Sequence, residues 1–190
     1  GMILDLEVDS AELQSTSWWA DNVKISGATS QIKITYSPLH VDVGQFQARV
    51  NGASIIGSGN ASLKPAGWVS NLNVQIPSLG AKDLLKLWPL GQRVKSRKWF
   101  EQNVNLGTLR NLRISTKKNV GRASQVASSF SFENANIKFM KHMPMISNGS
   151  GYGMLEESAL TVVSQGGHIE APEGGRIALN GSVFEIEDIR

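Results

Sequence analysis

The sequence predicts a mainly β protein, with an antiparallel sheet and two short helices. Three observations lead to this prediction. Apolar and polar residues alternate over most of the chain, 19 glycines and several Asn-Gly or Gly-Gly pairs separate the alternating runs, and only residues 80–102 place apolar side chains at helical spacing. Hydrophobic residues make up 41% and charged residues 18%, which excludes a disordered chain. We expect one β domain spanning residues 1–190.

The first part of the chain has the pattern of a strand meander. Leu4, Leu6 and Val8 alternate with acidic residues, which predicts one dry sheet face. The same rhythm returns in the runs 23–25, 32–36, 41–43, 46–50 and 71–76, with interruptions at Gly27, Pro38, Gly44 and a hairpin turn at Asn51-Gly52. We expect Pro77 to end the last of these strands and Ser78 to cap the following helix.

The helical segment is predicted in two pieces, Gly80 to Trp88 and Val94 to Gln102. Leu84, Leu85 and Leu87 recur at three-to-four-residue spacing, and Pro89 with Gly91 interrupts the pattern. The sequence therefore predicts a broken helical pair inside a β chain.

Alternation resumes after the helices and predicts strands in the runs 108–114, 126–132, 137–139, 154–163, 168–171, 177–179 and 183–186. Between residues 133 and 136 the register slips by one, so a bulge or turn is expected around Asn134. Turns are expected at Gly166-Gly167, Gly174-Gly175 and Asn180-Gly181. Gly149-Ser-Gly151-Tyr-Gly153 is also interpreted as a turn, because a phosphate-binding loop needs a helix directly after it.

The order of motifs from Leu84 onward resembles the AsmA-like family of bacterial envelope proteins, of the YhdP and TamB type. These motifs are a leucine-rich helix, Trp88-Pro89, a basic linker, Arg97-Lys-Trp99-Phe100, and a strand opened by Gly107. A second block runs from Phe130 through Pro144 to Gly153 and fits the same family. The resemblance covers about half of the chain, roughly residues 84–186.

This resemblance implies a curved antiparallel sheet, forming either a β-groove or an open sandwich, with an apolar concave face. It also implies a periplasmic protein that handles lipid between the inner and outer membranes, tethered to the inner membrane by a segment outside this sequence. The expected partners are lipid acyl chains and adjacent segments of a longer chain. Structural roles are expected for Trp88, Pro89, Trp99 and Gly107. The residues expected to line the apolar face are Leu4, Leu6, Ile32, Ile34, Phe130, Phe132, Ile137, Phe139, Ile177 and Leu179.

Charge is unevenly distributed. The segment 93–122 carries nine basic residues and one acid, Glu101, so its net charge is +8 in a chain whose total is +3. This zone is interpreted either as a solvated face or as a contact with an anionic membrane surface. Aromatic residues do not interleave with these cations beyond Trp99 and Phe100, so we expect no nucleic-acid partner.

No catalytic, cofactor or metal site is expected. Cysteine is absent, which excludes disulfides and thiolate ligands, and the histidines His40, His142 and His168 have no metal-ligand spacing. No serine elbow or base can be named. His142-Met143-Pro144-Met145 offers soft thioethers for Cu(I), but core packing is the favoured interpretation of these methionines.

Two alternatives to a lipid-holding face remain open. In the first, the sheet closes on itself and its aromatic residues fill an ordinary core. In the second, the chain is a structural or interaction module of the cell envelope, without ligand, whose edge strands pair with neighbouring segments. Strand-like sequence runs from the first residues to Arg190, which suggests an excerpt from a longer protein.

Overall fold

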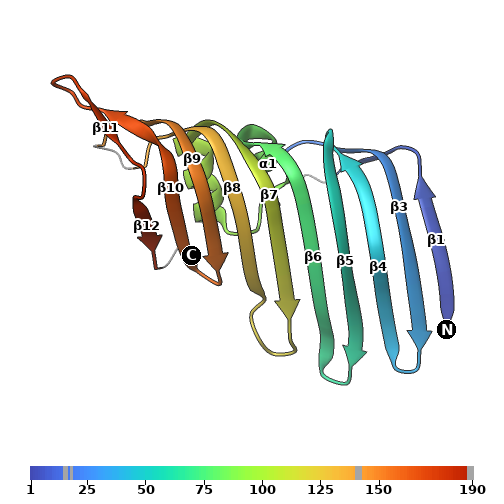
Figure 1. Ribbon diagram of the computed structural model, residues 1–190. Helices are drawn as coiled ribbons and strands as arrows, with labels where there is room; N and C mark the ends of the chain where they lie inside the picture. Colours follow the sequence, from blue (N-terminus) through green and yellow to red (C-terminus); the bar gives the residue numbers. More distant parts are fainter. Residues whose placement is uncertain (15–16, 18, 140–142, 188–190) are drawn as a thin grey trace.

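A computed structural model describes residues 1–14, 17, 19–139 and 143–187. Strands account for 66% of the chain and form one open antiparallel sheet, accompanied by two short helices, which confirms the predicted fold class (Figure 1). The strands are β1 (Met2–Val8), β2 (Ala11–Leu13), β3 (Val23–Tyr36), β4 (Leu39–Val50), β5 (Ala53–Lys64), β6 (Gly67–Gly80), β7 (Val104–Lys118), β8 (Gln125–Ile137), β9 (Ile146–Glu156), β10 (Ala159–Glu170), β11 (Arg176–Ala178) and β12 (Val183–Ile186). The strand order is β1-β3-β4-β5-β6-β7-β8-β9-β10-β11, with β2 also paired to β3 and β12 to β10.

One face of the sheet carries an uncharged and largely apolar row from edge to edge. Directly paired residues in a ladder point to the same side, so a chain of pairs across the strands defines a face. One such row contains no charged residue and runs through Leu6, Ser30, Phe46, Gly57, Val74, Ile114, Ser128, Leu155, Leu160 and Ile186. At the usual strand spacing its length is about 43 Å. We call this side the apolar face.

The opposite side, the polar face, carries the adjacent residue of each strand. Its corresponding row contains two glutamates, an arginine, two glutamines and several hydroxyl groups. The row runs through Glu7, Thr29, Gln47, Ile56, Gln75, Arg113, Ser129, Met154, Thr161 and Glu185. The alternation in the sequence therefore produces the predicted pair of unlike faces.

The two helices lie on the apolar face, behind the middle of the sheet as seen in Figure 1, near its upper rim. Helix α1 (Ala81–Leu87) and helix α2 (Val94–Asn103) agree with the predicted segments to within one residue at every end. Leu84 and Leu87 of α1 pack against the buried cluster Ala53, Ile76, Leu79, Leu109 and Leu112. At the solvent side of α1, Lys86 donates a hydrogen bond of 2.8 Å to Asp83, and this bond raises the pKa of Lys86 above its ordinary value.

Two predicted interruptions of the strand pattern and one predicted turn are irregularities within long strands. Gly44 lies inside β4, where the pairing shifts between Val43 and Phe46, and Gly27 lies inside β3 at a similar shift. Gly166 and Gly167 lie inside β10, so residues 159–163 of the predicted run 154–163 and residues 168–170 of the next run form one strand. Residues 154–156 belong to β9 instead. The turn predicted at Gly166-Gly167 was wrong because a glycine in a bulge and a glycine in a turn look alike in sequence.

Other local predictions were confirmed. Asn134 has a φ of 51° and lies where the β8–β9 register shifts between Phe132 and Ala135, which is the expected bulge. Asn51 and Gly52 both have positive φ and join β4 to β5, as a two-residue hairpin requires.

Pro77 does not end its strand, and Ser78 does not cap the helix. Strand β6 continues to Gly80, and the ladder with β7 pairs Ile76 and Ser78 but leaves Pro77 out. Asn111, which lies between the paired residues on β7, has a φ of 50°. A local break in the ladder therefore accommodates the missing N–H of proline. The Ser78 hydroxyl instead accepts a hydrogen bond of 2.9 Å from Arg110.

The sheet is largely a single layer. The accessible surface of the molecule is 11987 Å², whereas a compact protein of this mass exposes about 8,900 Å². Among the described residues, no large side chain is less than 2% exposed. Much apolar surface therefore stays in contact with solvent.

Candidate functional site

The part of the apolar face on strands β1 to β5 lies outside the main contacts of the helices, which are with β6 and β7. Leu6 is 47% exposed, and Met2 and Val8 on the same strand are also exposed. Ile32 and Ile34 on β3 are half-buried and pair with Leu4 and Met2. An apolar patch of this kind on a protein surface marks a contact with another apolar body. We call it the uncovered patch and define it as Met2, Leu4, Leu6, Val8, Ile32, Ile34, Val41 and Val43.

The ten residues predicted to line the apolar face divide into three groups. Leu4, Leu6, Ile32 and Ile34 belong to the uncovered patch. Phe130 and Phe132 pack against the cluster beneath the helices, so they help to form a core.

The remaining four lie toward the other edge of the sheet. Leu179 is buried with Ile146 and Ile169, and Ile137 and Phe139 pack against that second cluster. Ile177 pairs with Ile169 but is 57% exposed on the short edge strand β11. The structure therefore brings four of the ten together as an uncovered surface.

Aromatic rings lie against glycines of neighbouring strands on the apolar face. Phe130 pairs with Gly153 and Phe132 with Gly151, and a Cβ built on Gly153 would lie 2.6 Å from the Phe130 ring. Phe46 covers Gly57 in the same way, at 2.4 Å. The segment Gly149 to Gly153 is thus part of strand β9, and its interpretation as a turn was wrong. Its glycines make room for the rings of the neighbouring strand.

The residues singled out by the family resemblance have local structural contacts. The Trp88 indole donates a hydrogen bond of 2.8 Å to the Gln92 carbonyl, and the Pro89 carbonyl accepts one from the Gln92 N–H. The Trp88 ring lies 6.2 Å from that of Phe100, which links the two helices.

Trp99 and Gly107 connect the helical segment to the C-terminal strands. The Trp99 ring contacts Phe139 at 6.2 Å in an edge-on arrangement. Gly107 has a φ of 143°, and a Cβ there would lie 3.3 Å from Ala135 on β8, closer than most side chains allow. A glycine therefore fits both the backbone angle and the close approach of β8.

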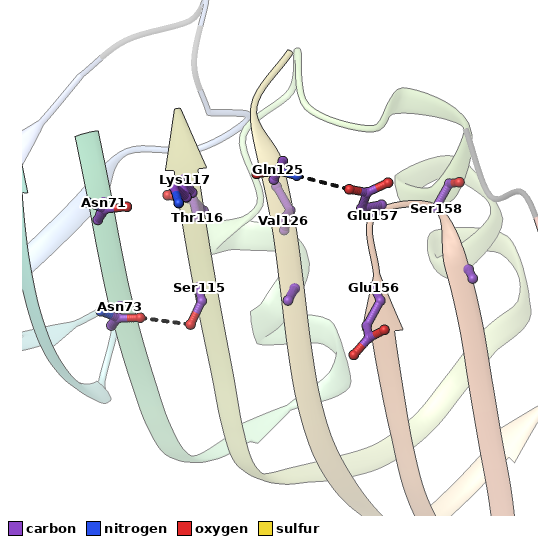
Figure 2. Close-up of a pocket in the computed structure, with 12 residues that line it drawn as sticks. Asn71, Asn73, Ser115, Thr116, Lys117, Gln125, Val126, Glu156, Glu157 and Ser158 are labelled. Atoms are coloured by element: carbon purple, nitrogen blue, oxygen red, sulfur yellow. Dashed lines mark hydrogen bonds between the residues drawn. The ribbon is translucent and has the colours of Figure 1, made fainter. Parts of the chain in front are cut away.

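The polar face contains a shallow depression with a volume of about 740 Å³, shown in Figure 2. Its side chains are mainly amides, hydroxyls and carboxylates from β6 to β10. Asn73 accepts a hydrogen bond of 2.7 Å from Ser115, and Gln125 donates one of 3.1 Å to Glu157. These two pairs are cross-strand contacts of the kind that stabilise a sheet.

The basic segment 93–122 does not form one surface. Arg97 on α2 lies 3.7 Å from Glu101, whereas Arg110 lies 3.2 Å from Glu133 on the polar face. Arg93 donates a hydrogen bond to the carbonyl of Glu157. The sequence places these cations close together, but the helices and the sheet separate them onto different sides.

A serine, a histidine and an aspartate that sequence reasoning did not connect meet on the polar face. His40 Nδ1 lies 2.6 Å from Ser62 Oγ, and His40 Nε2 lies 3.7 Å from Asp42. The His-x-Asp spacing within one strand was the available signal. The longer distance is outside hydrogen-bonding range, and none of the three lines the depression described above. We interpret the group as cross-strand pairing.

Met143 packs against the cluster of Ile146, Ile169 and Leu179, which favours core packing over copper binding; His142 lies outside the described residues. Within the described part of the chain, no three His, Cys, Asp or Glu residues are grouped as a metal site would require. Neither helix among these residues has the length and apolarity needed to cross a bilayer.

No known family model, curated protein or solved structure matches this chain. The AsmA-like resemblance accordingly remains a prediction from the order of its motifs.

Proposed function

We propose that this chain is a noncatalytic segment of a periplasmic AsmA-like protein, and that its apolar face holds lipid acyl chains on their way between the inner and outer membranes. The observation that carries the proposal is the uncovered patch on β1, β3 and β4, which is the part of the apolar face outside the main helix contacts. The motif order from Leu84 onward supports the family and, through it, the periplasmic location and the tether to the inner membrane.

Acyl chains suit this surface because it offers aliphatic contacts without charge. Leu4, Leu6 and Ile32 present only hydrocarbon, and each methylene removed from water contributes about 0.8 kcal/mol. Ten buried methylenes would contribute roughly 8 kcal/mol before the entropy of binding is subtracted. Along β1 the uncovered patch runs from Met2 to Val8, about 20 Å at the usual rise per residue, which is extended enough to accommodate an acyl chain.

The test is lipid retention by matched variants. Ile34→Asp places a charge in the uncovered patch and should abolish lipid that copurifies with the wild-type chain, as read by native mass spectrometry. Ile3→Asp adds the same charge on the polar face, where Ile3 is 63% exposed, and should retain the lipid. Both should keep the wild-type circular dichroism spectrum.

Three outcomes would contradict the proposal. These are a wild-type chain without lipid, equal lipid loss in both variants, and unfolding of Ile34→Asp. The last outcome would identify the patch as part of an ordinary core.

A second candidate function is a structural module that pairs with neighbouring segments of a longer chain. Strand β1 favours it, because within the described residues β1 pairs only with β3 and its other edge has no strand partner. Unpaired edges of this kind bind further strands. Concentration-dependent dimers without bound lipid, measured by light scattering, would favour this function over the first.

A further inference from the structure

One rim of the sheet combines exposed aromatic residues with unpaired cations. The β3–β4, β5–β6 and β7–β8 turns lie next to one another along the lower rim in Figure 1. The segments that form them are 36–39, 63–68 and 118–124, and we call them the turn rim. They contain Lys64, Lys118 and Arg122 and no acidic residue.

The apolar part of the turn rim is a row of side chains at the ends of four strands. Tyr36 lies opposite Leu39, and Leu63 lies opposite Trp68. Because His40 pairs with Ser62, Leu39 and Leu63 are neighbours across β4 and β5. The pairs Tyr36–Leu39 and Leu63–Trp68 therefore form one continuous row. Tyr36 is 59%, Trp68 45% and Leu63 41% exposed. This row belongs to the apolar face and lies at its border with the turns.

The turns themselves are close neighbours. A Cβ on Gly67 would lie 3.9 Å from Val120, so the β5–β6 and β7–β8 turns touch. Lys118 pairs with Ser70, two residues from Trp68, which places a cation beside the aromatic row. Lys64, Lys118 and Arg122 form no ion pair with any described residue, so their charges are available to a partner.

We propose that the turn rim docks onto the surface of a membrane that contains anionic lipids. Tryptophan and tyrosine favour the boundary between headgroups and hydrocarbon, because each has an apolar ring and a polar edge. Lysine and arginine near an anionic surface each strengthen binding about fivefold. The cations and rings of this rim match both components of such a surface. The turn rim, rather than the whole basic segment 93–122, is thus the proposed membrane contact. This proposal does not depend on the acyl-chain site.

Vesicle sedimentation tests the proposal. The wild-type chain should bind phosphatidylglycerol vesicles and bind neutral phosphatidylcholine vesicles much more weakly. The triple variant Lys64→Gln, Lys118→Gln, Arg122→Gln should lower partitioning onto the anionic vesicles about 100-fold, from three losses of about fivefold. Binding to anionic vesicles should shift the tryptophan fluorescence of the wild-type chain to the blue. Trp68→Ala should weaken this binding and remove the shift.

A matched control carries the same loss of charge away from the turn rim. Lys24→Gln, Lys95→Gln, Lys98→Gln changes three exposed lysines on β3 and α2, and it should bind anionic vesicles nearly as well as the wild type. Equal losses in the two triple variants would overturn the proposal, because net charge alone would then explain binding. Unchanged binding by the rim variant would overturn it as well, as would tighter binding of the wild type to duplex DNA than to the vesicles.

The result of the vesicle experiment can be separated from the result of the lipid-retention experiment. The rim variant should retain copurified lipid, whereas Ile34→Asp should lose it and still bind anionic vesicles. Circular dichroism should show wild-type strand content for both triple variants. If the chain binds anionic vesicles but retains no lipid, only the acyl-chain proposal fails. If it retains lipid but does not bind the vesicles, only the turn-rim proposal fails.

Discussion

At the scale of single residues, glycine acts on the apolar face as a partner for aromatic rings. Phe46, Phe130 and Phe132 each lie over a glycine of the next strand, so the ring fills the space that a Cβ would need. Alternation predicts that a phenylalanine faces this side, but the position of its ring over the neighbouring strand depends on a residue that is distant in sequence. This dependence on the cross-strand partner is why the glycines of β9 were misinterpreted as a turn.

Gly151→Ala should destabilise the fold. A Cβ at Gly151 would lie 2.0 Å from the Val163 carbonyl oxygen and 3.1 Å from the Phe132 ring, so backbone must shift. We expect a loss of about 1–3 kcal/mol in the free energy of unfolding, as for other overpacked sites. Urea denaturation would measure it. The control Gly44→Ala, whose nearest neighbour is the Gln31 oxygen at 3.9 Å, should change stability by at most about 0.5 kcal/mol.

At the scale of elements, the helices could be predicted closely, whereas the lengths of the strands could not. Leucine spacing and Pro89 define α1 and α2 locally, because helical hydrogen bonds join near neighbours. Strands such as β4 and β10 continue through glycines because their partners continue to pair beyond the bulge. The alternation of apolar and polar residues was enough to predict that the candidate-site residues share one face of the sheet. Its division into covered and uncovered parts depends on where the helices dock, which no local pattern encodes.

Leu84→Ala tests how much the helical cover stabilises the sheet. Leu84 is half-buried against the cluster of Ile76, Leu79 and Leu109, so its truncation should cost about 1–2 kcal/mol of unfolding free energy. Thermal unfolding would measure the change. Val94→Ala on α2, where Val94 is 59% exposed, should have an effect near zero. An equal effect of the two variants would show that α1 does not stabilise the cluster.

At the scale of the whole molecule, the open sheet should have a recognisable shape in solution. A compact protein of 190 residues has a radius of gyration of about 16 Å. Because the surface of this chain is larger than that of a compact protein, we expect a clearly larger radius from small-angle X-ray scattering, at a monomeric mass by light scattering. A monomer with a radius near the compact value would mean that the sheet folds over and covers the apolar face.

The strand order also has a consequence for how the molecule is made. Nearly every strand pairs with the one that precedes or follows it in the chain, and the exceptions, β1 with β3 and β12 with β10, skip a single short strand. Such local pairing keeps loop-closure entropy low and permits growth by successive hairpins. Each newly synthesised hairpin would therefore find its template already formed, so assembly can advance in one direction along the emerging polypeptide.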